Sequence, residues 1–311
     1  MSSPLVSVII PNYCHAQFLE ERIQSVLQQT YQDFELIIMD DCSPDGGASR
    51  EVIERYRHDP HVSQIVYNDV NSGSAFQQWH KGMELARGEY IWLAESDDSC
   101  DHRLLERLVG RLEATEAVMA FCRSVKYDEH GEKSHYAWQD CLRGDFVVDG
   151  ATFTREYLAT RNRVANASSV VFRREEALSV DSRYLQLRGE GDWMFWILLA
   201  ERGLVCFVNE ELNYFRFHEE NFTMKSVTTG TAYSNHRHVY DYLVEMGYLT
   251  GRKKHKVRMS CAHASTSLSI DKRKRDELLH QWDPYYIYRT LYFLLHTKGR
   301  MVEWIRQKGK R

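Results

Sequence analysis

The chain has 311 residues, of which 43% are hydrophobic and 12% are aromatic, and it contains five prolines. This composition excludes an intrinsically disordered protein, and the length allows one large domain with an appended region. The formal net charge is −4, yet residues 251–311 carry 16 Lys and Arg against 5 Asp and Glu, so a basic tail follows an acidic body. Two interpretations of the tail are open: it binds an anionic partner, or it pairs with the acidic body.

The cysteine pattern and the hydropathy predict a cytoplasmic protein. Seven cysteines are scattered along the chain without a C-x-x-C pair, which is typical of a reducing compartment: Cys14, Cys42, Cys100, Cys122, Cys141, Cys206 and Cys261. The first residues lack the basic region and apolar stretch of a secretory signal, and no segment has the apolar length of a membrane-spanning helix. If the basic tail binds lipid, the inner face of the cell membrane is the expected place of contact.

Strands and helices alternate along the first two thirds of the chain. Apolar runs predict strands at 5–10, 34–39, 65–67, 90–94, 118–122, 168–172 and 205–208. Helical spacing of apolar residues predicts helices at 18–27, around 79–85, at 104–112 and at 193–199. This alternation predicts an α/β fold with a mainly parallel central sheet that is covered by helices on both faces.

Two stretches depart from the alternation. Residues 125–165 lack clean periodicity and predict a short hairpin with loops over the crevice at the sheet edge. From about residue 229 the pattern turns mostly helical and basic. We therefore predict two regions, residues 1–225 as an α/β domain and residues 226–311 as a basic, mostly helical extension.

Carboxylates crowd at the ends of two predicted strands. Glu95, Asp97 and Asp98 follow the strand at 90–94, and Asp40-Asp41 ends the strand at 34–39. Neighbouring carboxylates raise one another's pKa, and a divalent cation is the natural compensation. Ligands of open α/β sheets bind beyond the carboxyl ends of the strands. The alternative is that these residues cap the following helices. For Asp40-Asp41 the cap and the site are equally supported, whereas a site is favoured for residues 95–98.

The same residues, taken in order, closely resemble the inverting family 2 glycosyltransferases with the GT-A fold. The resemblance covers roughly residues 4–222. The segments that carry it are Val6 to Tyr13, Gln29 to Ser43, Ala86 to Ile91 leading into Ser96-Asp97-Asp98, Gly191-Asp192-Trp193, and Leu212 to His218. The resemblance implies a metal-dependent transfer of a sugar from a nucleotide diphosphate donor to a saccharide or lipid-linked saccharide acceptor, in bacterial surface polysaccharide synthesis. A UDP-sugar is the favoured donor, and no nucleic acid partner is expected.

The resemblance also assigns roles on the donor side. Pro11, Tyr13 and Asp41 would lie around the nucleobase, with the Asp41 carboxylate accepting a hydrogen bond from it. Asp97 and Asp98 would hold the ribose and the Mn²⁺ or Mg²⁺ ion that bridges the diphosphate. Such an ion suits the chemistry, because a nucleoside diphosphate leaves easily only when a cation neutralises its developing charge.

Two further roles follow from later motifs. His218 would approach the same ion or the phosphates, although by itself it is equally compatible with an ordinary surface histidine. Asp192 would be the general base that takes the proton from the attacking acceptor hydroxyl. Glu190 is the alternative base, and Asp192 is favoured because its register with the following tryptophans matches the family.

Some positions depart from the family pattern or have a plain structural explanation. Glu95 stands where many relatives have Asp, so its longer side chain either reaches the metal or faces solvent. His80 stands where relatives often have Asn. Trp193 and Trp196 fit a helix core better than a sugar-stacking platform. A stripe formed by Tyr288, Leu291, Tyr292 and Leu295 fits packed core or a peripheral membrane contact.

Two other functions remain as rivals. A nucleotidyltransferase shares a similar sheet and metal, but it requires a Gly-rich phosphate loop after the first strand, where this chain has Pro11-Asn12-Tyr13. A noncatalytic nucleotide-sugar or glycan-binding module is the alternative from another class. The presence of Asp192 argues weakly against it.

Overall fold

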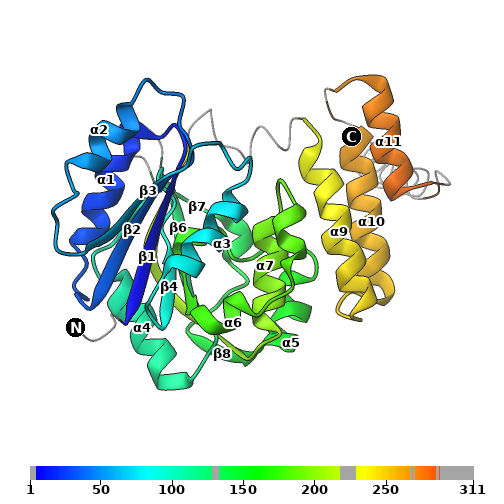
Figure 1. The fold of residues 1–311 in the computed structure, drawn as a ribbon. Coiled ribbons are helices and arrows are strands. Elements are labelled where there is room, and N and C mark those ends of the chain that lie inside the picture. Colours follow the sequence, from blue (N-terminus) through cyan, green and yellow to red (C-terminus); the bar gives the residue numbers. More distant parts are fainter. Residues whose placement is uncertain are drawn as a thin grey trace, which may run out of the picture. The chain divides into compact units, whose positions relative to one another are not determined.

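The computed structural model describes residues 5–127, 133–217, 229–266, 268, 270–284 and 287 (Figure 1). Among these residues the chain divides into two compact units. One comprises residues 5–187 and 191–217, and the other comprises 188–190 and the described residues from 229 onward. The predicted boundary at residues 225 and 226 lies outside the described residues.

The first unit is built around one large sheet. Its strands are β1 (Val6–Asn12), β2 (Phe34–Asp40), β3 (Val62–Tyr67), β4 (Tyr90–Leu93), β5 (Ser99–Cys100), β6 (Met119–Tyr127), β7 (Lys133–His135), β8 (Phe146–Asp149), β9 (Val170–Arg173) and β10 (Leu204–Arg216). The order across the sheet is β3-β2-β1-β4-β9-β6-β10-β5, with β7 on β6 and β8 on β10. Strands β3, β2, β1, β4, β6 and β10 run in one direction, so the mainly parallel sheet is confirmed.

Helices cover the sheet on both faces (Figure 1). They are α1 (Ala16–Leu27), α2 (Ala48–Glu54), α3 (Ala75–Leu85), α4 (Leu104–Thr115), α5 (Gly150–Phe153), α6 (Arg174–Leu178) and α7 (Gly191–Ala200). Short turns of other helix types are η1 (Ala137–Gln139), η2 (Thr154–Leu158), η3 (Ala167–Ser169) and η4 (Ser182–Gln186). Helix α2 has only seven residues, too few to show a period, which is why the sequence did not predict it.

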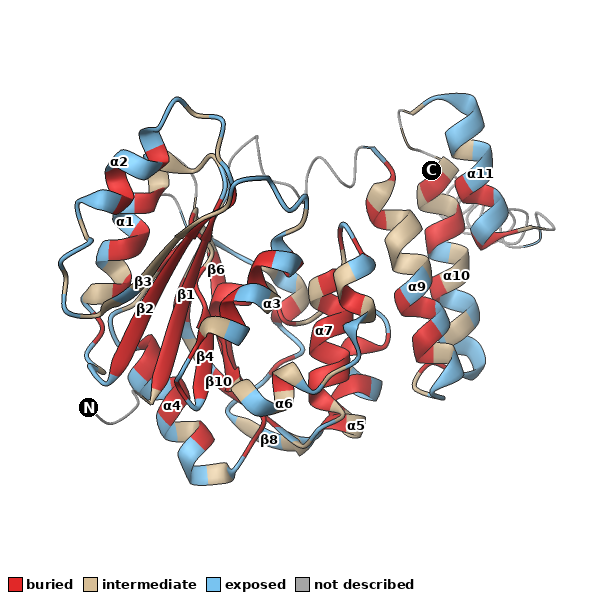
Figure 2. Ribbon diagram, in the orientation of Figure 1, coloured by how far each residue is buried: buried red, intermediate tan, exposed pale blue. Residues whose placement is uncertain are grey.

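The central strands are buried on both faces (Figure 2). Val8 and Ile10 of β1 belong to a core that includes residues of α1, α2 and α4. Ile9 points to the other face, where α3 approaches so closely that a Cβ on Gly82 would lie 2.7 Å from the Ile9 side chain. Strands buried in this way read as continuous apolar runs, and such runs were the signal that predicted them.

Two strands differ from their prediction. Strand β9 lies between β4 and β6 but runs antiparallel to both, because its connection returns through residues 137–169 instead of a crossover helix. Strand β10 continues from the predicted 205–208 to Arg216. Its polar second half stays in the sheet by pairing with β6 and β5, and bulges around Glu211 break the alternation that a sequence pattern requires.

Residues 133–167 form more structure than the predicted hairpin and loops. The hairpin is present as β6 with β7, where Lys126 pairs with Ser134. Strand β8 then pairs with β10, and α5 follows with a five-residue π turn, η2. This segment carries side chains to the carboxyl edge of the sheet, as described below.

The second unit contains α9 (Thr231–Glu245), α10 (Gly251–Thr266) and α11 (Lys272–Trp282), in line with the predicted helical region. Trp282 is buried at its centre, 5.4 Å from the ring of Tyr240. The Tyr288–Leu295 stripe lies outside the described residues. Among the residues that the structure describes, no helix combines the length and apolar character needed to cross a membrane.

Candidate active site

The first acidic pair lies where β1 and β2 end side by side. Asp40 is the last residue of β2 and pairs in register with Asn12, the last residue of β1. The Asp40 carboxylate accepts hydrogen bonds from Asn12 Nδ2 at 2.7 Å and Ser43 Oγ at 2.6 Å. The N-cap of α2 is Gly47, so neither carboxylate of the pair caps that helix. The helix-cap interpretation of Asp40-Asp41 is therefore wrong.

Asp41 is held by the segment that leads into α3. It is only 4% exposed, and its carboxylate accepts from Asn68 Nδ2 at 2.7 Å, Ser72 Oγ at 2.7 Å and Gln78 Nε2 at 2.9 Å. The backbone N–H of Ser72 also donates to it at 2.9 Å. A carboxylate with this many donors is fixed in one orientation.

The other predicted nucleobase residues lie at the same edge. Pro11 is buried in β1 opposite Met39, and Tyr13 follows on the loop with 46% of its surface exposed. Each of the two loops turns at a cysteine with a positive φ of 58°, Cys14 after Tyr13 and Cys42 after Asp41. Non-glycine residues in this conformation are uncommon and cluster at functional sites. The structure thus brings Pro11, Tyr13 and Asp41 to one edge of the sheet.

The second acidic segment follows β4 at the neighbouring position of this edge. Asp98 is buried and accepts from Ser168 Oγ at 2.7 Å and from the backbone N–H of Arg216 at 3.2 Å. Glu95 accepts from Trp79 Nε1 at 2.8 Å, so its side chain turns toward α3 and not to solvent. The N-cap of α4 is Arg103, so residues 95–98 do not cap that helix either.

The electrostatics of this segment are unfavourable in the protein alone. Loss of hydration raises the pKa of Glu95 to about 8, and the charges of Asp97 and Asp98 add to the rise. Burial likewise raises the pKa of Asp98 to about 7, with a further contribution from Asp97. Both carboxyls are therefore poorly stabilised as anions, which is the condition that a bound cation relieves.

A buried arginine lies beneath the segment. Arg22 of α1 is 0% exposed, and its guanidinium nitrogens have no hydrogen-bond acceptor among the described residues. The guanidinium stacks 4.9 Å from the ring centroid of Trp92 in β4. Its charge opposes the rise in the pKa of Asp98 and Glu95. The sequence contained a signal for this residue, because Arg22 interrupts the apolar stripe formed by Leu19, Ile23 and Val26.

The residues present fit a divalent ion that is shared with a ligand. No cluster of three or more His, Cys, Asp or Glu side chains suited to a metal occurs in the described part of the chain. A cation that bridges a diphosphate needs only one or two protein carboxylates, since phosphate and water oxygens complete its shell. Asp97, which is partly exposed, and Asp98 supply such hard oxygen ligands. His218, the third predicted ligand, lies outside the described residues.

Asp192 stands at the start of α7. Gly191 precedes it and lies directly against Phe76 of α3, where a Cβ would collide with the phenyl ring. Asn162 Nδ2 donates to Asp192 Oδ2 at 2.9 Å. Burial raises the pKa of the Asp192 carboxyl above its ordinary value. A carboxylate with a raised pKa and a fixed orientation has the properties of a general base.

The remaining candidates have structural partners. Glu190 has a positive φ of 60° and forms an ion pair with His236 at 3.6 Å, within the second unit. His80 lies 3.2 Å from the hydroxyl of Tyr184. Trp193 and Trp196 are buried in the helix core, as the apolar pattern predicted.

Sequence reasoning missed the residues that orient the acidic groups. They are Asn68, Ser72 and Gln78 on Asp41, Trp79 on Glu95, Ser168 and Arg216 on Asp98, and Asn162 on Asp192. Gln78 and Trp79 had a signal, because they directly precede His80, the position that departs from the family pattern. Ser168 and Asn162 had none, since polar residues in an irregular segment show no pattern.

Known proteins share this arrangement of elements. The model of the family described as Glycosyl transferase family 2 matches residues 7–178, more than half of the chain. The chain belongs to this family. It is a glycosyltransferase, as the sequence predicted. The edge with Asp41 and Glu95–Asp98 lies within the matched residues, whereas strand β10 lies beyond them.

Individual relatives agree with the family assignment. The putative teichuronic acid biosynthesis glycosyltransferase TuaG of Bacillus subtilis is 27% identical over 217 residues, which cover 68% of this chain and 79% of TuaG. Glycosyltransferase GlyG of Streptococcus pneumoniae is 32% identical over 157 residues, which cover 50% of this chain and 48% of GlyG. The match to GlyG thus spans about half of each protein.

Solved structures share the fold. The crystal structure of S. aureus TarS residues 1–349 in complex with UDP-GlcNAc has a TM-score of 0.56 and 14% sequence identity to this chain. The match covers 89% of this chain and 71% of that one. The GT-A fold predicted from the sequence is confirmed.

Proposed function

We propose that the protein is a metal-dependent inverting glycosyltransferase. It transfers a sugar from a nucleotide diphosphate donor, with a UDP-sugar favoured, to a saccharide or lipid-linked saccharide acceptor in bacterial surface polysaccharide synthesis. The observation that carries the proposal is the crowded segment Glu95–Asp98, poor in donors and placed beside the Asp41 loop at one sheet edge. The name of TuaG and the UDP-GlcNAc in the TarS structure support the acceptor class and the donor class.

The donor nucleotide would lie across the ends of β1, β2 and β4. Pro11 and Tyr13 would form the walls of the base site, and the oriented Asp41 carboxylate would accept a hydrogen bond from the base. Asp97 would contact the ribose. Asp97 and Asp98, with His218, would hold Mn²⁺ or Mg²⁺, which would supply the positive charge that stabilises the leaving diphosphate.

Asp192 would act on the acceptor. Asn162 orients the carboxylate, which takes the proton of the acceptor hydroxyl as that oxygen attacks the anomeric carbon. The new C–O bond forms on the face opposite the departing diphosphate, so one displacement inverts the anomeric configuration. A sugar hydroxyl is a weak nucleophile, and a positioned base contributes typically about 10²–10⁴-fold to the rate.

Substitution of the base tests the proposal. We expect Asp192→Asn to lower sugar transfer and donor hydrolysis about 10²–10⁴-fold while the Kd for UDP, measured by calorimetry with Mn²⁺, stays unchanged. Glu190→Gln is the matched control and should retain activity. Loss of activity in Glu190→Gln but not in Asp192→Asn would identify Glu190 as the general base.

The same measurements separate the rival functions. A noncatalytic nucleotide-sugar or glycan-binding module would bind the nucleotide but release no nucleoside diphosphate from any UDP-, GDP- or dTDP-sugar, with or without Asp192. A nucleotidyltransferase would release pyrophosphate from a nucleoside triphosphate mixed with a sugar phosphate. UDP release without pyrophosphate formation distinguishes the glycosyltransferase from both.

We also propose that the protein contacts the membrane surface from the cytoplasmic side. Exposed basic residues on α10 and α11 support this: Arg252, Lys253, Lys256, Lys272, Arg273 and Lys274. Each basic residue near an anionic surface contributes about 1 kcal/mol. Cosedimentation should therefore detect binding to anionic vesicles and not to neutral ones, and equal binding to both would contradict the electrostatic contact.

A further inference from the structure

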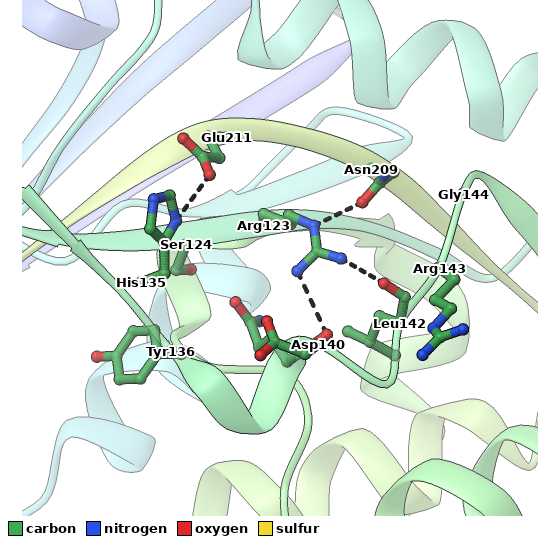
Figure 3. A pocket seen from close by; sticks show the side chains of 11 residues that line it. Arg123, Ser124, His135, Tyr136, Asp140, Leu142, Arg143, Gly144, Asn209 and Glu211 are labelled. Atoms are coloured by element: carbon green, nitrogen blue, oxygen red, sulfur yellow. Dashed lines mark hydrogen bonds and ion pairs between the residues drawn. The ribbon is translucent and has the colours of Figure 1, made fainter.

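A cavity of about 380 Å³ opens beside the second half of β10 (Figure 3). It lies between β6, β10 and the segment from β7 through η1 to Gly144. Its lining is polar and includes Arg123, His135, Tyr136, Asp140, Arg143 and Glu211. The volume falls in the range of small-ligand sites, and no residue of the cavity belongs to the predicted donor or metal set.

Part of the lining holds the cavity in shape. The Arg123 guanidinium donates to Asn209 Oδ1 at 2.5 Å, to the carbonyl of Gln139 at 3.3 Å and to the carbonyl of Leu142 (Figure 3). At the other end His135 Nδ1 lies 2.9 Å from a carboxylate oxygen of Glu211. These contacts fix the η1 segment to β6 and β10, so the cavity exists before a ligand arrives.

Three other groups of the lining are not used by the fold. The hydroxyl of Tyr136, the carboxylate of Asp140 and the guanidinium of Arg143 have no hydrogen-bond partner among the described residues, and all three line the cavity. Together they offer an acceptor, a multiple donor and a hydroxyl that is both. The ring of Tyr136 itself is held by Lys126, whose ammonium lies 4.5 Å from the ring centroid, and by Trp138. This combination of free polar groups on a fixed wall matches the vicinal hydroxyls of a sugar. The carboxylates of Asp140 and Glu211 disfavour a free anion.

Residues of the cavity lining are linked to both sides of the proposed reaction centre. Tyr136 lies within electrostatic reach of Asp98, whose charge adds to burial in raising the pKa of the Tyr136 hydroxyl. Gln139 Nε2 donates to the carbonyl of Arg163 at 3.3 Å, and the preceding residue, Asn162, holds Asp192. Contacts of the cavity lining thus lead to the segments that hold Asp98 and Asp192.

We infer that the cavity binds one or two sugar units of the acceptor, with Tyr136, Asp140 and Arg143 contacting their hydroxyls. The inference rests on the proposed glycosyltransferase function and names the acceptor part of that site. Arg123 is then a positioning residue, because its guanidinium builds the wall through hydrogen bonds to Asn209, Gln139 and Leu142.

Saturation-transfer NMR with the full chain, Mn²⁺ and UDP tests the inference. The probes are the methyl glycosides of glucose, galactose, N-acetylglucosamine and rhamnose, each at millimolar concentration. At least one glycoside should receive saturation, and the signal should fall at least about fivefold in Arg143→Gln and in Asp140→Asn. Arg155→Gln, which replaces an exposed arginine that does not line the cavity, should match the wild type.

The outcomes separate the cavity from the donor site. Both charged residues are exposed, so the variants should keep the wild-type melting temperature and the wild-type Kd for UDP. Absence of saturation for every glycoside, or a signal unchanged in both variants, overturns the inference. Displacement of the glycosides by millimolar inorganic phosphate identifies an anion site and also overturns it. Failure of UDP to bind the wild type while glycosides still bind in the cavity would reject the proposed function and not the cavity.

Discussion

The two acidic strand ends look alike in the sequence and differ in the structure. At the end of β2, four donor groups of Asn68, Ser72 and Gln78 donate hydrogen bonds to the Asp41 carboxylate and hold it in place. At the end of β4, the Glu95 carboxylate accepts one hydrogen bond and the Asp98 carboxylate accepts two. The pKa values of both groups are raised by burial and by neighbouring charges. The first carboxylate is stabilised by the protein and suits recognition of a neutral donor group. The second group lacks such stabilisation and suits a cation.

The largest expected effect is on turnover and concerns only the carboxylates at the end of β4. Asp98→Asn should lower turnover at least about a hundredfold, because a bound cation contributes several kcal/mol to stabilising the leaving diphosphate. Titration of activity with Mn²⁺ should show a weaker apparent affinity, and EDTA should abolish wild-type activity. Asp101→Asn, at a nearby carboxylate that is bonded to Arg103, is the control. Equal losses in both variants would contradict a specific metal role for Asp98.

The next effect is on stability and concerns the first strand end. Asp41→Ala should lower the free energy of unfolding by about 1–3 kcal/mol, because its donors are left without a partner in a buried place. Urea denaturation measures the change. An unchanged urea midpoint would show that water replaces the lost acceptor and that Asp41 is not locked as described.

A double-mutant cycle probes the buried cation. If Arg22 offsets the charge of Asp98, the effects of Arg22→Met and Asp98→Asn on unfolding at pH 8 should be non-additive by about 0.5–3 kcal/mol. The double variant should be more stable than the sum of the single effects predicts. Strict additivity would mean that Arg22 acts only through its stacking on Trp92.

A further effect is a pH dependence of stability. The pKa of Glu95 rises from its ordinary 4.5 to about 8 in the folded protein, so the folded state holds this proton more tightly than the unfolded state does. Metal-free wild type should therefore lose stability as the pH rises through this window. Glu95→Gln should lose less, because only Asp98 then contributes to the loss from this segment. Its advantage in melting temperature should therefore be absent near pH 4 and largest above pH 8. An advantage that is constant with pH would contradict the shift.

The sequence by itself determined the order of strands and helices along the chain, because buried strands appear as continuous apolar runs and amphipathic helices as periodic ones. It also placed Asp41, Asp97, Asp98 and Asp192 at the ends of strands or helices, because each directly adjoins a strand or helix that the local pattern predicts. Only the tertiary structure decided that β9 runs antiparallel, that β10 continues as a strand to Arg216, and which donors reach which carboxylate. Such contacts join residues as far apart as Asp98 and Ser168, and the polar side chains that make them have no periodicity to reveal their partners. The cavity at Tyr136, Asp140 and Arg143 is of the same kind, since it arises where an irregular segment folds back onto two strands.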